Sequence, residues 1–290
     1  MSLVLELDDG LHRPLRASAP PATQLNQLGL LADLPGTWVG GGFNVMALPT
    51  GNGGFRVKFN ATVETLAFAP VGAAVPNRGS VQGDISLFGL HYLQQVSDAT
   101  TFEALHVEPG LWLNVPATSD PKAGPSVVRQ STIPHGDSLL AQSIVLDDIA
   151  GGPHIGKAST HPTGDDPKLK LPGYTEPYTL TPPPPGIPDE ARVNPNVLLT
   201  NTLQAQAKQD MKVVRTQVIQ VSTQPHGGIV NIPFLTANAN ATKLDATFWI
   251  ETVQQADGLQ FLQLQYTQTV ILHFENIDWP HVSVATLVKQ

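Results

Sequence analysis

The chain has 290 residues, a length that suits one large β domain or two small ones. Its formal net charge is −8 and it has no run of Lys or Arg, so we expect no nucleic-acid partner, because binding to phosphates needs a concentrated positive surface. Charged residues make up only 14% of the chain and cysteine is absent, which predicts a surface of Gln, Asn, Thr and Ser and excludes disulfides, thiolate catalysis and cysteine-ligated metals.

The first residues predict an irregular arm. Residues 1–24 contain Pro14, Pro20 and Pro21 among small residues, which disfavours a packed element. The stretch 1–10 lacks the cationic and apolar regions of a signal peptide, and no window has the roughly 20 consecutive apolar residues of a membrane span. We therefore expect a cytoplasmic protein with no membrane contact.

A short helix and a clear strand follow the arm. Leu25, Leu28 and Leu31 recur at helical spacing, which predicts a helix placed to plug one end of a barrel. From Gly36 onward the period becomes two, most clearly over 55–64, where apolar and polar residues alternate. Such alternation is typical of a half-buried strand.

More strands follow at intervals that suit an antiparallel meander. The candidates are 84–95, 101–106, 111–115, 126–131, 138–146, 213–223, 231–235, 247–253, 259–274 and 282–289. In the segment 259–274 the large apolar side chains share one face, whereas Gln263, Gln265 and Thr267 lie on the other. The sequence therefore predicts a mainly β fold, an antiparallel lipocalin-like barrel with short helices, in a single domain over residues 1–290.

A proline-rich stretch interrupts the strands. Residues 151–196 hold a run of prolines at 182–185 and many others. We interpret the stretch as an insertion wrapped over the barrel, because neither flanking part resembles a complete β fold by itself. Asn194 and Pro195 then form a helix-start signal, which predicts a helix near 196–210.

Histidine is the main reservoir of metal ligands and proton-transfer groups in this chain, which has nine of them. His281 begins the last predicted strand, in which His281, Ser283, Ala285 and Leu287 share one face. The two small residues beyond the histidine leave room for a flat ligand, and a neutral ring nitrogen there can coordinate iron axially. A hydrogen-bonded structural histidine is the plain alternative.

Two further histidines are candidates for a site. His106 and Glu108 lie on one side of a strand, which is compatible with an ion pair or with a hydrogen bond behind a metal ligand. His135 lies on a loop, where functional residues concentrate, although a structural role fits both histidines as well. The chain has no P-loop, no dinucleotide fingerprint after a strand, no zinc-protease motif and no serine-hydrolase elbow.

Three segments resemble the nitrobindin-like haem proteins, a branch of the lipocalin and fatty-acid-binding-protein superfamily. LPGTW at 34–38 looks like that group's opening Gly-Thr/Ser-Trp strand, and LHVEPG at 105–110 is similar to its Leu-His-x-Glu-x-Gly segment. WPHVSVA at 279–285 resembles the terminal strand whose histidine is the proximal haem ligand. The three segments occur in the family's order, but the proline-rich stretch has no counterpart, so the chain resembles a larger bacterial variant.

The resemblance implies a haem-b-binding barrel in which His281 ligates the iron, Trp38 closes the barrel base and His106 lies near or behind the pocket. The distal surroundings would then decide between binding of a diatomic gas, isomerase- or peroxidase-like chemistry on peroxynitrite or peroxide, and plain haem storage. A distal histidine such as His106 or His135 favours peroxide activation.

Two alternatives from other classes remain open. One is a metal-free barrel that carries an apolar small molecule, and the other is a cofactorless enzyme that uses His106 and Glu108 for acid–base catalysis. The exposed strand edges of a β protein also allow a homodimer.

Overall fold

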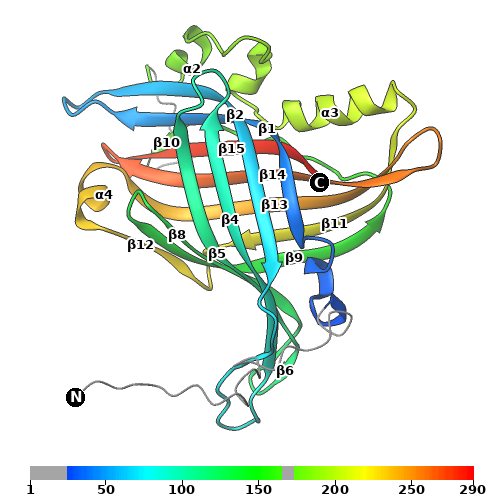
Figure 1. The fold of residues 1–290 in the computed structure, drawn as a ribbon. Helices are drawn as coiled ribbons and strands as arrows, with labels where there is room; N and C mark the ends of the chain where they lie inside the picture. The colour runs from blue at the N-terminus through cyan, green and yellow to red at the C-terminus, as the bar shows by residue number, and fades with distance from the viewer. Residues whose placement is uncertain (1–24, 165–172) are drawn as a thin grey trace, which may run out of the picture.

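The computed structural model describes residues 25–164 and 173–290, and its main feature is a closed antiparallel β-barrel (Figure 1). In spatial order the ten barrel strands are β1 (Gly36–Pro49), β2 (Phe55–Pro70), β4 (Ser86–Asp98), β5 (Ala104–Val115), β8 (Ser126–Ile133), β9 (Asp137–Ala150), β11 (Lys212–Ser222), β13 (Asn240–Gln254), β14 (Gln260–Phe274) and β15 (Ile277–Lys289). The first and last strands close the barrel, with Trp38 opposite Lys289 and Val45 opposite Val282. The predicted mainly β, lipocalin-like barrel is confirmed.

The remaining elements are short. They are the strands β3 (Val75–Pro76), β6 (Thr118–Ser119), β7 (Lys122–Ala123), β10 (Thr163–Gly164) and β12 (Gly228–Asn231), and the helices η1 (Gly29–Leu31), α2 (Glu176–Leu180), η2 (Asp189–Arg192), α3 (Val197–Ala207) and α4 (Pro233–Asn238). No helix in the part of the chain that the structure describes is long and apolar enough to cross a membrane. The predicted irregular arm at 1–24 lies outside the described residues.

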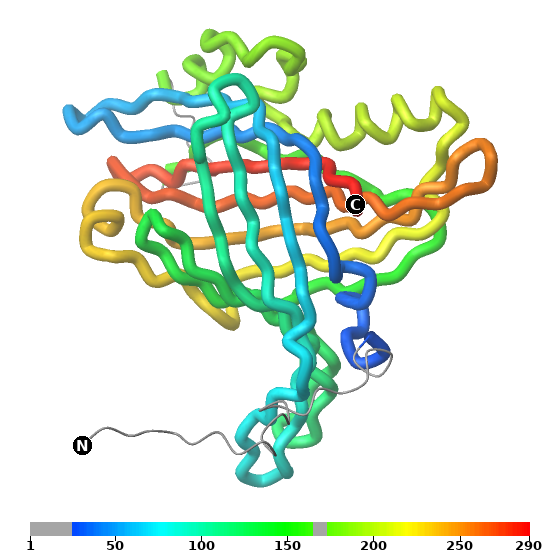
Figure 2. The backbone as a smooth tube through the Cα atoms, viewed as in Figure 1, coloured from blue at the N-terminus to red at the C-terminus, as the bar shows by residue number. Residues whose placement is uncertain are grey.

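Two connections project together from the barrel wall, one between β2 and β4 and the other between β5 and β8 (Figure 2). They are joined through the side chain of Gln82, whose Oε1 accepts hydrogen bonds from the backbone N–H groups of Ser119 at 2.7 Å and Asp120 at 2.9 Å. This projection leaves the barrel interior free of both connections.

One end of the barrel is closed by the segment that precedes β1. Leu28, Leu31 and Leu34 are buried together with Trp38 in the inner hydrophobic cluster. The indole N–H of Trp38 donates to the carbonyl oxygen of Leu34 at 2.7 Å, which ties the plug to the first strand. This arrangement agrees with the short helical plug that the leucine spacing predicts, since residues 25–27 are α-helical and η1 follows them.

A second hydrophobic cluster lies on the outside of the barrel. Tyr178 of α2, Ala191 of η2 and Leu199 of α3 are buried there with side chains of β1, β14 and β15, among them Phe43 and Trp279. The described part of the proline-rich stretch therefore covers the outer wall of the barrel, and the helix predicted near 196–210 is present as α3 (Figure 1).

Candidate functional site

The inner wall of the barrel carries polar side chains above its hydrophobic base. Strand alternation directs Glu64, Gln94, Glu108 and Arg129 inward, and each of them is at most 8% exposed. Buried polar groups are costly unless they are paired, and these four are linked by hydrogen bonds. We call them, with Tyr92 and Tyr266, the polar layer.

One half of the polar layer is centred on a buried ion pair. The guanidinium of Arg129 donates to Glu108 Oε1 at 2.6 Å, to the hydroxyl of Tyr92 at 3.1 Å and to Gln268 Oε1 at 2.7 Å. The hydroxyl of Tyr92 also donates to Glu108. Burial opposes ionisation of Glu108, but the charge of Arg129 and the hydrogen bond to His106 outweigh it and hold the pKa of Glu108 well below its usual range. Glu108 is therefore a carboxylate.

The other half is centred on Glu64. The hydroxyl of Tyr266 donates to Glu64 Oε2 at 2.5 Å, Thr62 donates to Glu64 Oε1 at 2.9 Å, and Gln94 donates to the Tyr266 hydroxyl at 3.0 Å. Burial raises the pKa of Glu64 although these donors act in the opposite direction. The polar layer thus contains two carboxyl groups whose surroundings drive their pKa values apart.

The three histidines singled out from the sequence lie together at the end of the barrel opposite Trp38. His106 Nε2 lies 3.1 Å from Glu108 Oε2, and the rings of His106 and His135 are 5.7 Å apart between centroids. His135 lies in the turn between β8 and β9 and is exposed. His281 is close enough that positive charge on either of the other two histidines lowers its pKa. We call this end of the barrel the mouth.

His281 lies on the inner wall, as its strand pattern predicts. Ala285 and Leu287, on the same face of β15, are buried in the inner cluster. The ring Nε2–H of His281 donates to Asn44 Oδ1 at 2.7 Å, and Ser283 donates to the same oxygen at 3.1 Å. Burial, and then the charges of His106 and His135, lower the pKa of His281 to about 4. Its imidazole is therefore neutral at physiological pH.

His281 has part of the geometry of an axial haem ligand. A metal-ligating histidine usually donates its other ring N–H to an oxygen acceptor, which fixes the ring orientation, and Asn44 provides such an acceptor for His281. The other ring nitrogen, Nδ1, has no hydrogen-bond partner within residues 25–164 and 173–290, whereas ligation through Nε2, the nitrogen farther from Cβ, would require the ring to release Asn44. His281 is also partly exposed to solvent, unlike the polar layer beneath it, so the mouth is accessible.

The inner wall also holds polar atoms without partners. Asn60 Oδ1 and Ser131 Oγ are buried and accept or donate no hydrogen bond within the described residues. Both side chains are on the inward faces of their strands, in line with Thr62 and Arg129 respectively. Among the described residues, no group of three or more His, Asp or Glu side chains is arranged to hold a bare metal ion.

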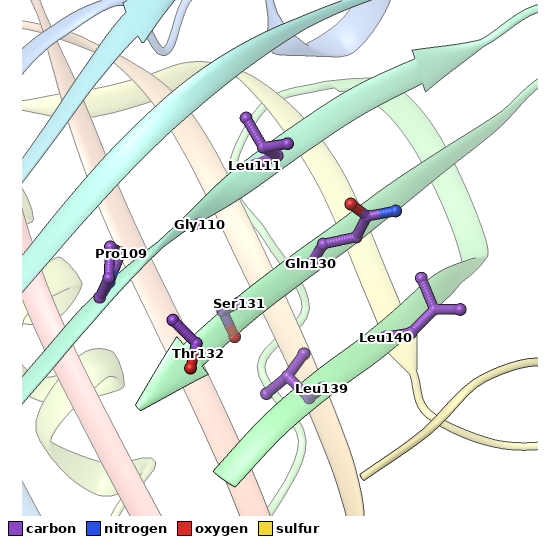
Figure 3. Close-up of a pocket in the computed structure, with 8 residues that line it drawn as sticks. All are labelled: Pro109, Gly110, Leu111, Gln130, Ser131, Thr132, Leu139 and Leu140. Atoms are coloured by element: carbon purple, nitrogen blue, oxygen red, sulfur yellow. The ribbon is translucent and has the colours of Figure 1, made fainter. Parts of the chain in front are cut away.

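An apolar depression on the barrel wall is separate from the three histidines. Figure 3 shows it over β5, β8 and β9, where Leu111, Gln130, Leu139 and Leu140 line it beside Gly110. Gly110 has no side chain to fill this part of the wall, and a Cβ at that position would clash with the carbonyl oxygen of Gln130. None of the residues that line it is a titratable group.

Several residues of the mouth and the polar layer give no recognisable signal in the sequence. Asn44 follows Phe43 in β1, and Arg129 lies between Val128 and Gln130 in a strand where a polar residue is normally expected to face water. Asn44 is recognised only by its hydrogen bond with His281, and Arg129 only by its ion pair with Glu108. Both contacts depend on the closed barrel.

Comparisons with known proteins define no family for the chain. No protein-family model matches it, and no curated protein matches it in sequence. Among solved structures, the crystal structure of Rv2717c from M. tuberculosis is similar, with 16% sequence identity, a TM-score of 0.47 and coverage of 94% of this chain and 99% of that chain. A likeness this distant does not bear on what the chain binds.

Proposed function

We propose that the mouth of the barrel binds haem b, with His281 as the axial ligand of the iron. The observation that carries the proposal is the state of His281: a neutral imidazole on the inner wall, oriented by Asn44 through one ring nitrogen and uncommitted at the other. Deprotonation is required for ligation, and the lowered pKa of His281 supplies it without help from the metal.

The chemistry of a bound haem would depend on its axial ligand and its distal surroundings, and haem supplies binding or activation of small oxygen and nitrogen species. The chain contributes His106 beside the ligand space, with the Glu108 carboxylate 3.1 Å behind it. A carboxylate in that position orients a histidine that exchanges protons. This pair favours ligand chemistry over plain haem storage within the proposal.

The same pair supports a second candidate, acid–base catalysis without a cofactor. Glu108 is tied to Arg129 and Tyr92, so it orients His106 and does not itself exchange protons. His106, whose side chain is 22% exposed, is the group that can reach a substrate at the mouth. In this candidate His106 is essential, whereas His281 only shapes the site.

A visible-absorption titration tests the haem proposal. Adding haemin to the apo-protein is expected to give a saturable Soret band, and His281→Ala is expected to shift or abolish it, because the iron loses its protein ligand. His91→Ala is the matched control, since His91 is also on a strand but is exposed on the outer wall. A wild-type protein without a Soret band, or an unchanged ferric spectrum in His281→Ala, would contradict the proposal.

A further inference from the structure

The β1–β2 hairpin extends past the mouth. Pairing of β1 with β15 stops at Val45 opposite Val282, whereas β1 and β2 remain paired with each other as far as Pro49 opposite Phe55. Figure 1 shows this hairpin projecting beyond the neighbouring barrel strands, at the upper left. Its final residues are therefore positioned beside the mouth without being part of the closed wall.

The two faces of this hairpin differ in chemistry. Phe55, Val57 and Phe59 of β2 pack against the outer hydrophobic cluster. Because side chains alternate along a strand, Arg56 and Lys58 lie on the opposite face. This is the face that continues into Asn60, Thr62 and Glu64 on the inner wall, so both cations stand on the barrel-interior side of the hairpin.

Register places these cations next to the proposed iron ligand. Asn60 pairs directly with Asn44, and Asn44 accepts the hydrogen bond from His281. Lys58 is the next residue toward the rim on that face, about 7 Å along the strand, and Arg56 is one further step away. Both are exposed, and neither has an ion-pair partner within residues 25–164 and 173–290.

The acidic groups at this rim leave the cations free. Asp98 is the acidic residue hydrogen-bonded to Asn60, whose side-chain N–H donates to the Asp98 carboxylate at 2.7 Å. Its carboxylate also accepts from the backbone N–H groups of Thr100 and Thr101. An anion that enters the mouth therefore meets Lys58 and Arg56 as unpaired positive charges in a chain whose formal net charge is −8.

We propose that Arg56 and Lys58 bind the carboxylates of the porphyrin, an inference that rests on the proposed binding of haem at the mouth. Haem carries both propionates on one edge of the macrocycle, so a haem whose apolar edge enters the barrel leaves both carboxylates at the rim. Arginine and lysine there supply charge-assisted hydrogen bonds to them. The hairpin thus selects planar ligands that have an anionic edge.

Three porphyrins test this inference: haemin, haemin dimethyl ester and metal-free protoporphyrin IX. The double variant Arg56→Gln/Lys58→Gln is expected to bind haemin and protoporphyrin IX about three- to tenfold more weakly at low salt, because each exposed ion pair contributes modestly. The difference should shrink at high ionic strength. Binding of the dimethyl ester should be unchanged, because it has no free carboxylate.

The matched control is Arg78→Gln/Lys122→Gln, which removes the same charge from exposed positions on the two projecting connections. It should bind all three porphyrins as the wild type does. Arg56→Glu/Lys58→Glu should weaken haemin binding more than the glutamine variant, and a thermal melt of each variant verifies that the barrel is intact.

The outcomes separate this inference from the haem proposal. Equal haemin affinity in wild type and Arg56→Gln/Lys58→Gln, with a normal Soret band that depends on His281, overturns the role of the hairpin and leaves the haem proposal standing. The absence of a Soret band with both haemin and its ester overturns the haem proposal. In that case the affinities of wild type and Arg56→Gln/Lys58→Gln for protoporphyrin IX test the role of the hairpin, because this porphyrin has the same carboxylates and no iron. Equal affinities overturn the inference.

Discussion

Arg129 makes hydrogen bonds to three side chains in the barrel interior. Besides its bonds to Glu108, Tyr92 and Gln268, its guanidinium carbon lies 5.7 Å from the ring centroid of Trp112 and 5.5 Å from that of Phe248. Arginine can make such planar contacts with aromatic rings while it binds a carboxylate. The positive charge is therefore compensated on several sides without access to water.

Replacing Glu108 should show how much the free energy of unfolding depends on its buried ion pair with Arg129. Glu108→Gln is expected to lower the free energy of unfolding by about 3–5 kcal/mol, because it leaves the buried charge of Arg129 without a counter-ion. Urea denaturation measures the change. Glu103→Gln, at an exposed position just before the same strand, should change stability by less than about 0.5 kcal/mol. Similar losses in both variants would mean that the pair is not desolvated.

The positions of individual side chains were predictable only where residue chemistry and strand spacing agreed. His281 could be placed on the inner wall because the residues that share its face of the strand include Ala285 and Leu287, which are buried in the inner cluster. Glu108 was predicted beside His106, and the 3.1 Å contact between them confirms that geometry. Arg129 could not be identified, because the sequence does not reveal which polar residue of a strand pairs across the inside of a barrel.

At the scale of elements, α3 rests on a polar seam. Gln206 of α3 donates to Gln263 Oε1 at 2.6 Å, and Gln263 in turn donates to Glu251 Oε2 at 2.5 Å. Glu251 is fully buried, and its Oε1 has no partner within the described residues. Burial raises the pKa of Glu251 to about 8. The side chain beneath the helix is therefore a protonated acid at neutral pH.

This acid should make docking of α3 depend on pH. An undocked state would expose Glu251 and return its pKa to the ordinary 4.5. Between that value and about 8, the docked state keeps a proton that the undocked state releases, so a rise in pH favours undocking. Hydrogen exchange of 197–207, corrected for intrinsic rates, should show an opening constant that rises up to about tenfold per pH unit.

Glu251→Gln is the control for this dependence, because it keeps a neutral side chain of the same shape at every pH. Its corrected exchange should be independent of pH over the same range. The interpretation would be wrong if the variant and the wild type showed the same slope.

The sequence located α3 but not the surface beneath it. Asn194 and Pro195 predict the start of a helix, and α3 does begin at Val197. The sequence placed Gln263 and Gln265 on the polar face of β14 without indicating what covers that face, and both are buried, at 1% and 0% exposed. A strand buried on both faces usually has two apolar faces, and here hydrogen bonds to α3 replace them.

At the scale of the whole molecule, the barrel is closed at one end and accessible at the other. Trp38 and the leucines of the plug fill the base, and the histidines surround the mouth. Alternation along many strands is enough to predict this architecture. The position of the insertion was not predictable in the same way, since proline-rich chain has no periodicity that indicates which wall it covers.

Burial of His281 at the mouth should make the free energy of unfolding decrease in acid. The pKa of His281 falls from its ordinary 6.5 to about 4 on folding. Between these values the unfolded chain binds a proton that the folded chain does not, so stability is lost as the pH falls from 6.5 to 4. The loss attributable to this group is up to about 1.4 kcal/mol per pH unit.

Chemical denaturation of wild type and His281→Gln at several pH values measures this contribution as the difference between the two pH profiles. The wild type should lose more stability than the variant as the solution is acidified. Parallel profiles would show that His281 accepts a proton in the folded barrel as readily as in water.

The seam between β1 and β15 has a consequence for how the chain is made. It joins residues more than 230 positions apart, since Asn44 pairs with Ser283, and such long-range pairing is slow because the loop between the partners must be ordered first. During translation β1 therefore waits without its partner until β15 has left the ribosome. Until then one edge of β1 and one edge of β14 are both unpaired and open to other chains, so the nascent barrel is prone to aggregate during that interval.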